Sequence, residues 1–192
     1  NYMYKAMKQS IILIAFLLVG GMIFSQTNLS GPFRNDTTLT STGNPYLVNT
    51  RLTVPDTVTL TIEDGVEFIF TSGDIYLLGN LNINGTSSSP VIMRGPTGTP
   101  SNNWDGISVP GTSLLKSATI NIKYLNLSNA QNGISASLET GSCSVLHSNF
   151  SDCGTGLRVD TIKANSIVDS CSFTLCAVGA IIADGTIQHS TF

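Results

Sequence analysis

Charge is scarce in this chain of 192 residues, of which only 11% are Asp, Glu, Lys or Arg. Acidic residues outnumber basic ones by 12 to 9, for a formal net charge of −3. Nucleic-acid recognition needs a basic patch or stripe, so this composition argues against a nucleic-acid partner. Disorder is also excluded, because 41% of the residues are apolar and they fall in short alternating runs.

Motifs of nucleophilic, phosphate-binding and metal chemistry are also missing. No Ser-His-Asp order, phosphate-binding loop or calcium-loop repeat is present. The four cysteines have no zinc-type or C-x-x-C spacing, since even Cys171 and Cys176 are separated by four residues. The sequence therefore predicts no metal site and no cofactor.

Long apolar runs are absent except near the start of the chain. Lys5 and Lys8 precede the run Ile11–Val19, and Ser25 supplies a small residue at the expected cleavage site, as in a secretory signal peptide. The run is short for a membrane span, although a retained signal anchor is the alternative. We predict initiation at Met7, cleavage after Ser25, and a mature chain with seven basic and twelve acidic residues, hence a formal charge of −5.

What the sequence does contain is a repeat with a fixed 23-residue step. Each unit carries short apolar alternations broken by Asn, Ser, Asp and Gly, which indicates strands and turns. The matching sets are Ile122, Val145 and Val168; Leu127, Phe150 and Phe173; Ala130, Cys153 and Cys176; and Gly133, Gly156 and Gly179. A self-similar period of about 20 to 50 residues is typical of a solenoid.

The repeat predicts an all-β fold, a single-stranded parallel β-helix in which residues 23 apart stack about 4.8 Å from each other. Leu127, Phe150 and Phe173 should then form an internal column. The repeated glycines at 133, 156 and 179 should mark a corner where the backbone needs a conformation that other residues resist.

We divide the chain into three parts. Residues 1–25 are the signal peptide with an upstream artefact, 26–50 a cap or irregular first rung, and 51–192 the β-helix. A fourth repeat copy, Ile187 to Phe192, comes four residues early and stops with the chain. An uncapped parallel strand edge there predicts end-to-end self-association of the fragment.

Two pairs of residues share a repeat register and could react or bind together. Cys153 and Cys176 should be neighbouring inward thiols, either free or joined in a disulfide. His147 and His189 lie two rungs apart, about 9.6 Å, which is too far for one metal ion. We therefore interpret these histidines as surface residues.

Arg158 and Asp160 are weak catalytic candidates, because they share the outward face of one predicted strand, with Lys163 close by. Their repeat equivalents are Ser135 with Ser137 and Ile181 with Ala183, so neighbouring rungs supply no second carboxylate. Glycosidases use two carboxylates at a defined separation, so a surface ion pair is the better interpretation of Arg158 and Asp160.

Several runs carry a family resemblance: Leu60 to Phe68, Gly79 to Gly85, Trp104-Asp105-Gly106-Ile107 and the 23-residue units. With these runs the chain, from about Tyr46 to Phe192, resembles exported bacterial right-handed parallel β-helix proteins. The resemblance implies secretion, or display on the outer surface of a bacterium, in a polysaccharide-rich setting. Many members end in a type IX secretion sorting domain, which is not seen here. The resemblance implies no catalytic residue.

These observations leave more than one function open. The leading hypothesis is a non-catalytic secreted or cell-surface protein, adhesive, structural or glycan-binding, whose partner is an extracellular polysaccharide or cell-surface glycan. The alternative is a carbohydrate-active enzyme, a polysaccharide lyase or glycoside hydrolase, whose active site lies in further rungs. Ice binding by a threonine array is weakened because Thr59-x-Thr61 does not recur at the rung period.

Overall fold

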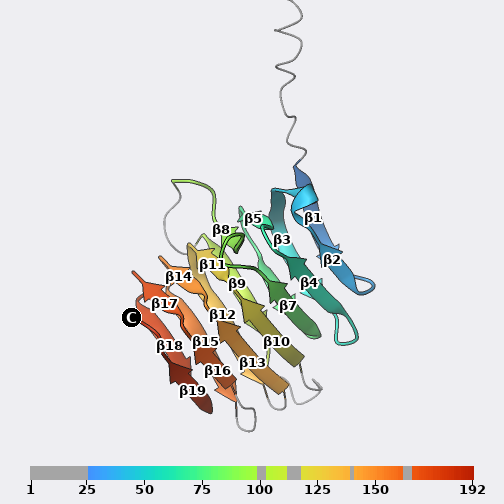
Figure 1. Ribbon diagram of the computed structural model, residues 1–192. Helices are drawn as coiled ribbons and strands as arrows, with labels where there is room; N and C mark the ends of the chain where they lie inside the picture. The colour runs from blue at the N-terminus through green and yellow to red at the C-terminus, as the bar shows by residue number, and fades with distance from the viewer. Residues whose placement is uncertain (1–25, 99–102, 112–117, 139–140, 162–165) are drawn as a thin grey trace, which may run out of the picture.

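The computed structural model describes residues 26–98, 103–111, 118–138, 141–161 and 166–192 (Figure 1). The predicted leader, residues 1–25, and Lys163 lie outside these ranges. Regular structure in the described residues is β-strand, apart from one 3-10 turn, η1 (Ser41–Gly43). Among the described residues, no helix is long and apolar enough to cross a membrane.

Parallel strands stack into three faces around one core (Figure 1). The first face contains β5 (Glu67–Phe70), β8 (Val91–Arg94), β11 (Leu125–Ser128), β14 (Asn149–Ser151) and β17 (Ser172–Thr174). The second face contains β6 (Asp74–Leu77), β9 (Trp104–Val109), β12 (Ala130–Leu138), β15 (Thr155–Thr161) and β18 (Val178–Ile182). The third face contains β2 (Thr37–Leu39), β4 (Thr59–Glu63), β7 (Asn80–Asn84), β10 (Ala118–Lys123), β13 (Gly141–Leu146), β16 (Ser166–Asp169) and β19 (Gly185–Gln188).

The first rungs join these faces. The long strand β3 (Tyr46–Val54) pairs with β5 through its first half and with β6 through its second half. On its other side β3 pairs with β1 (Thr27–Pro32), and β2 pairs with β4 at the 23-residue step. Strand pairing thus already begins within residues 27–39.

Strand register confirms the predicted parallel β-helix and its 23-residue rung. Leu127 pairs with Phe150, and Phe150 pairs with Phe173. The last rung is shorter, as the early fourth copy suggested, because Val168 pairs with Ile187. The rings of Phe173 and Phe192 also stack, with centroids 5.2 Å apart. Conversely, Leu81 pairs with Ile120, a longer step that contains the excursions on either side of β9.

Alternation of apolar and polar residues builds the core, because every second side chain of a strand points inward. In β4, for example, Leu60 and Ile62 are fully buried between half-buried neighbours. The largest buried side chain, Trp104, stacks on Phe70 with ring centroids 3.9 Å apart, and its indole N–H donates to the Ser128 carbonyl at 3.0 Å.

The repeated glycines hold equivalent positions within β12, β15 and β18, and the special backbone conformation predicted for them was wrong. Gly133, Gly156 and Gly179 are not among the residues with positive φ. A Cβ at Gly133 would instead lie 2.4 Å from the Gly156 carbonyl oxygen and 2.9 Å from the Phe150 ring. Glycine is needed here because adjacent rungs and the internal aromatic column approach the backbone closely.

Left-handed backbone conformations occur in two series of residues between strands, and the residues in both series are not glycine. Tyr124, His147 and Ser170, which follow one another at the 23-residue step, have φ of 51°, 50° and 55°, and His189 has φ of 46° on the shorter rung. Asn129, Asp152 and Leu175 form the second such series. Their amides still donate to the next rung, as in the 2.9 Å bond from His147 N–H to the Asp169 carbonyl, so the ladder continues around the corner.

Candidate functional site

A charged and aromatic cluster lies at the start of the second face. We call it the Arg51 cluster, and it comprises Arg51, Asp74, Tyr76 and Asp105. Arg51 Nε donates to Asp74 Oδ1 at 2.8 Å, and the guanidinium lies over the Tyr76 ring, 4.4 Å from its centroid. The Asp74 side chain is only 4% exposed, whereas that of Arg51 is 55% exposed. The cluster therefore combines a buried acceptor with an accessible donor.

Backbone register places these residues beside one another. Arg51 and Asp74 directly precede the paired residues Leu52 and Ile75 of β3 and β6. Asp74 pairs with Gly106, and the N–H of the exposed Asp105 donates to the Gly73 carbonyl at 2.9 Å. The rung ladder thus brings three chain segments together.

The electrostatics of the cluster follow from these contacts. The hydrogen bond to Asp74 raises the pKa of Arg51 above its ordinary value, with Asp105 and Tyr76 acting in the same direction and desolvation opposing them. Within the described part of the chain, Arg51 donates through Nε only, which leaves both Nη groups without a protein partner. A guanidinium can donate five hydrogen bonds in a fixed fork, so these groups are available to a ligand.

Sequence reasoning missed this cluster, because it named Arg158 and Asp160 as the candidates and did not consider Arg51 with Asp74. The available signal was the 23-residue separation of Arg51 and Asp74, the same step that relates Phe150 to Phe173. In the ladder Asp74 pairs with Gly106, and Gly106 pairs with Asn132, so no common residue type marks this position as part of the repeat.

Arg158 and Asp160 form the predicted surface ion pair on β15. Their Nε and Oδ2 atoms are 2.6 Å apart, and the side chains are 51% and 43% exposed. In the ladder Arg158 pairs with Ser135 and Ile181, so neither neighbouring rung adds a charged group to it. Asp160 pairs with Ser137 on β12, so among the described residues its ladder partner on that rung supplies no second carboxylate.

One row of outward residues connects the two sites across the second face. Tyr76 pairs with Ser108, Ser108 with Ser135, and Ser135 with Arg158. Three ladder steps make this row about 14 Å long. We call it the second-face row, a line of hydroxyl groups with an aromatic ring and an arginine at its ends.

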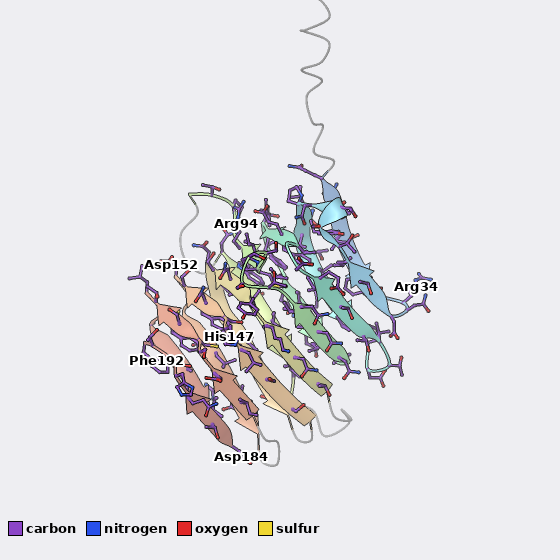
Figure 2. All side chains as sticks on the ribbon, in the orientation of Figure 1. Arg34, Arg94, His147, Asp152, Asp184 and Phe192 are labelled. Carbon is purple, nitrogen blue, oxygen red and sulfur yellow. The ribbon has the colours of Figure 1, made fainter. Side chains whose placement is uncertain are left out.

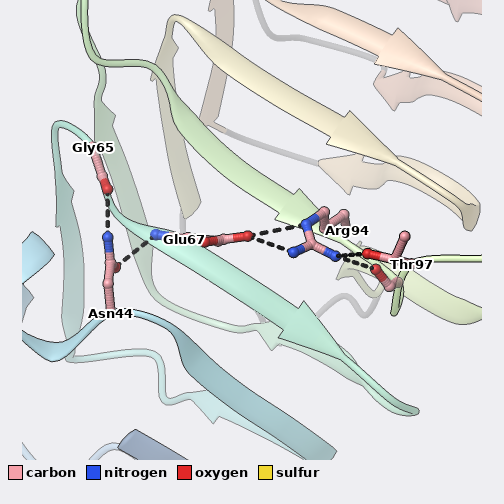
Figure 3. Close-up of polar contacts among 6 residues, drawn as sticks. Asn44, Gly65, Glu67, Arg94 and Thr97 are labelled. Carbon is pink, nitrogen blue, oxygen red and sulfur yellow. Dashed lines mark hydrogen bonds and ion pairs between the residues drawn. The ribbon is translucent and has the colours of Figure 1, made fainter. Parts of the chain in front are cut away.

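A second arginine pair has a structural role. On the first face Arg94 donates to Glu67 through Nε at 3.0 Å and Nη2 at 2.7 Å (Figure 3). Its Nη1 donates to the Gly95 carbonyl and to Thr97, while Asn44 accepts from the Glu67 N–H and donates to the Gly65 carbonyl (Figure 3). All three guanidinium nitrogens of Arg94 are therefore engaged, and the pair fixes the loop that leaves β8.

The histidines lie on the surface, as predicted. Both side chains are exposed; His147 stacks on Tyr124 with centroids 4.9 Å apart, and His189 Nδ1 lies 2.9 Å from Asp169 Oδ1. This contact lowers the pKa of Asp169 below its ordinary value, helped by Gln188 and Ser170 and opposed by desolvation. No group of three His, Cys, Asp or Glu residues that could hold a metal ion occurs within the described residues.

The cysteines are free thiols in the structure. Cys143, Cys153 and Cys171 are buried and Cys176 is half-buried. Burial raises the pKa of the Cys143 thiol to about 12, and that of Cys153 to about 12 with the neighbouring Cys176 thiol contributing. Thiols of this kind pack as small apolar side chains and are poor nucleophiles.

Comparison with known proteins extends the fold assignment. Residues 31–167 match the family model described as a pectate-lyase-like β-helix domain. Neither a search of the curated proteins nor a search of the solved structures finds a match. The family match covers most of the three-faced stack and includes Arg51, Asp74, Tyr76, Asp105 and Arg158. This chain belongs to the pectate-lyase-like β-helix domain family.

Proposed function

We propose that the protein is a secreted or outer-surface bacterial β-helix protein that binds glycans across the second-face row and serves in adhesion or matrix structure. The observation that carries this proposal is the row itself, with the open Nη groups of Arg51 beside Tyr76 at one end and Arg158 at the other. Saccharides are bound by aromatic rings and by hydrogen-bonding groups that face outward from a rigid scaffold.

The scaffold favours binding because it holds the row in place. Each residue of the row is fixed by the parallel ladder of β6, β9, β12 and β15, so little backbone ordering is needed when a ligand arrives. The row is uncharged between its ends, which suits the hydroxyl groups of a sugar chain.

Binding can be tested by titrating the purified protein with defined oligosaccharides and following amide chemical shifts. We expect shifts confined to the second face and at least a fivefold loss of affinity in Tyr76→Ala. Arg34→Ala is the matched control for the loss of a surface side chain. Arg34 is exposed, is not part of the second-face row, and lies at the opposite end of the stack from Phe192 (Figure 2). Shifts elsewhere, or equal binding by Tyr76→Ala, would contradict the proposal.

A carbohydrate-active enzyme is the second candidate, favoured by the family match and by Asp74 and Asp105 on adjacent rungs. Asp74, however, is 2% exposed and accepts from Arg51, so its carboxylate does not reach a substrate. We expect no turnover of uronates or neutral glycans in reducing-end and unsaturated-product assays. Turnover that disappears in Asp105→Asn or Arg158→Ala would instead assign an enzyme.

A further inference from the structure

We infer that the Arg51 cluster selects neutral saccharides over uronic acids; this inference rests on the proposed glycan-binding function. Pectate is a polymer of ionised uronic acids, so the description of the family points to an anionic ligand. The charges and hydrogen-bond capacity of this particular chain point the other way.

The charge balance is the first step. The single positive group of the cluster, Arg51, is already paired with Asp74 at 2.8 Å. Asp105 is exposed on the adjacent rung, where its N–H donates to the Gly73 carbonyl at 2.9 Å, next to Asp74. One guanidinium against two carboxylates gives the cluster a formal charge of −1, so an incoming carboxylate meets a site of its own sign.

Hydrogen-bond capacity is the second step. The free Nη groups of Arg51 only donate, and the carboxylate of Asp105 only accepts. A sugar hydroxyl does both, so two neighbouring hydroxyls can accept from Arg51 and donate to Asp105. An ionised uronate carboxylate only accepts, so it can satisfy Arg51 but leaves Asp105 facing another anion.

Tyr76 supplies the third step. Arg51 lies over the Tyr76 ring, and the outward neighbours of Tyr76 in the ladder are Thr53 on β3 and Ser108 on β9. Arg51 comes from the β3 side, and on the β9 side the ladder neighbour is Ser108, whose side chain is small. The apolar C–H face of a sugar ring can pack there, directly in line with Ser108 and Ser135.

The test compares an oligogalacturonide with the same oligomer after reduction of its carboxyl groups to primary alcohols. The two probes share length and linkage and differ mainly in charge. We expect the reduced, neutral oligomer to bind at least ten times more tightly at low ionic strength, with the ratio falling as salt is added.

The Asp105→Asn variant removes one negative charge and one obligate acceptor while keeping the shape of the side chain. It should lower the preference for the neutral oligomer at least threefold. Asp184→Asn is the matched control, because Asp184 is exposed and lies between β18 and β19 on the C-terminal rungs (Figure 2), whereas Arg51 belongs to β3. It makes the same charge change and should leave the ratio unaltered.

The outcomes separate selectivity from function. If both oligomers bind, both are weakened at least fivefold in Tyr76→Ala, and the uronate binds equally or better, glycan binding stands and the selectivity is overturned. An unchanged ratio in Asp105→Asn also overturns it. If neither oligomer binds, or Tyr76→Ala binds as tightly as the unaltered protein, the proposed function fails and the selectivity fails with it.

Discussion

Replacing Gly156 with alanine should destabilise the protein, whereas the same replacement at Gly179 should not. The two glycines hold equivalent positions in the paired strands β15 and β18. A Cβ at Gly156 would lie 2.6 Å from the Gly179 carbonyl oxygen and 2.6 Å from the ring of Phe173, which is 4% exposed. The three atoms nearest to a Cβ at Gly179 would belong to side chains, the first being a ring carbon of Phe192 at 2.5 Å, and Phe192 is 72% exposed.

Two opposing effects set the magnitude. Because neither glycine has positive φ, alanine restricts the unfolded chain and contributes about 0.4 to 1 kcal/mol of stability at both sites. Overpacking against a fixed backbone oxygen and a buried ring costs about 1 to 3 kcal/mol, which applies to Gly156. The expected result is a net loss of about 1 to 2 kcal/mol for Gly156→Ala and a change within about 0.5 kcal/mol for Gly179→Ala.

Urea unfolding followed by far-UV circular dichroism measures both variants, with the fluorescence of Trp104 as a second probe. Rungs of a solenoid can unfold separately, so agreement of the two probes shows whether the loss spreads beyond the last rungs. Equal losses in the two variants would refute the steric argument and support a special backbone conformation at these positions. A more stable Gly156→Ala protein would refute both explanations.

Three further results are expected. Phe150→Ala should cost about 3 to 5 kcal/mol in the same unfolding assay, because Phe150 is fully buried and stacked on its neighbour; a loss below about 1 kcal/mol would remove it from the core. A maleimide at neutral pH should label the half-buried Cys176 before Cys143, whose thiol has its pKa raised to about 12 by burial; mass mapping that shows the opposite order would contradict this. An NMR titration should give Asp169 a pKa below its ordinary value, and that pKa should rise in His189→Ala. Because the pKa is depressed in the folded protein, the contact stabilises the fold at pH values above the unfolded pKa, and this stabilisation is lost as pH falls through the folded pKa. An unchanged titration in His189→Ala would exclude the contact.

The internal column was predictable because a parallel ladder places like residues on like. A 23-residue step in the sequence becomes one ladder step in space, so the sequence alone assigns Leu127, Phe150 and Phe173 to one stack. The same reasoning placed Arg158 opposite Ser135 and found no charged group on the rungs beside it. Periodicity therefore determined both the core and the surface wherever the rungs are regular.

Irregular rungs and backbone conformations were not predictable in this way. Arg51 and Asp74 are still related by the 23-residue step, but the two side chains differ, and a search for similar residues passes over an ion pair. The left-handed φ values of Tyr124 and Leu175 contradict local preference, because bulky residues rarely adopt that region. The surrounding ladder imposes this conformation, so no composition signal marks it.

The strength of the contacts along the second-face row also bears on how binding could serve adhesion. Arg51 and Arg158 can each contribute a hydrogen bond worth about 1.5 kcal/mol, and packing against Tyr76 adds about 1 kcal/mol. A total of about 4 kcal/mol, from which the cost of association is still to be subtracted, limits one site to a Kd of about 1 mM or weaker. A single free protein with this affinity would bind little glycan. When many copies are displayed together and the polysaccharide repeats its binding unit, every contact after the first becomes intramolecular. This multivalency can raise the avidity by about 10² to 10⁴. Weak single-site binding is therefore consistent with an adhesive role, and glycan capture should rise steeply with the density of immobilised protein; capture that depends linearly on density would argue against it.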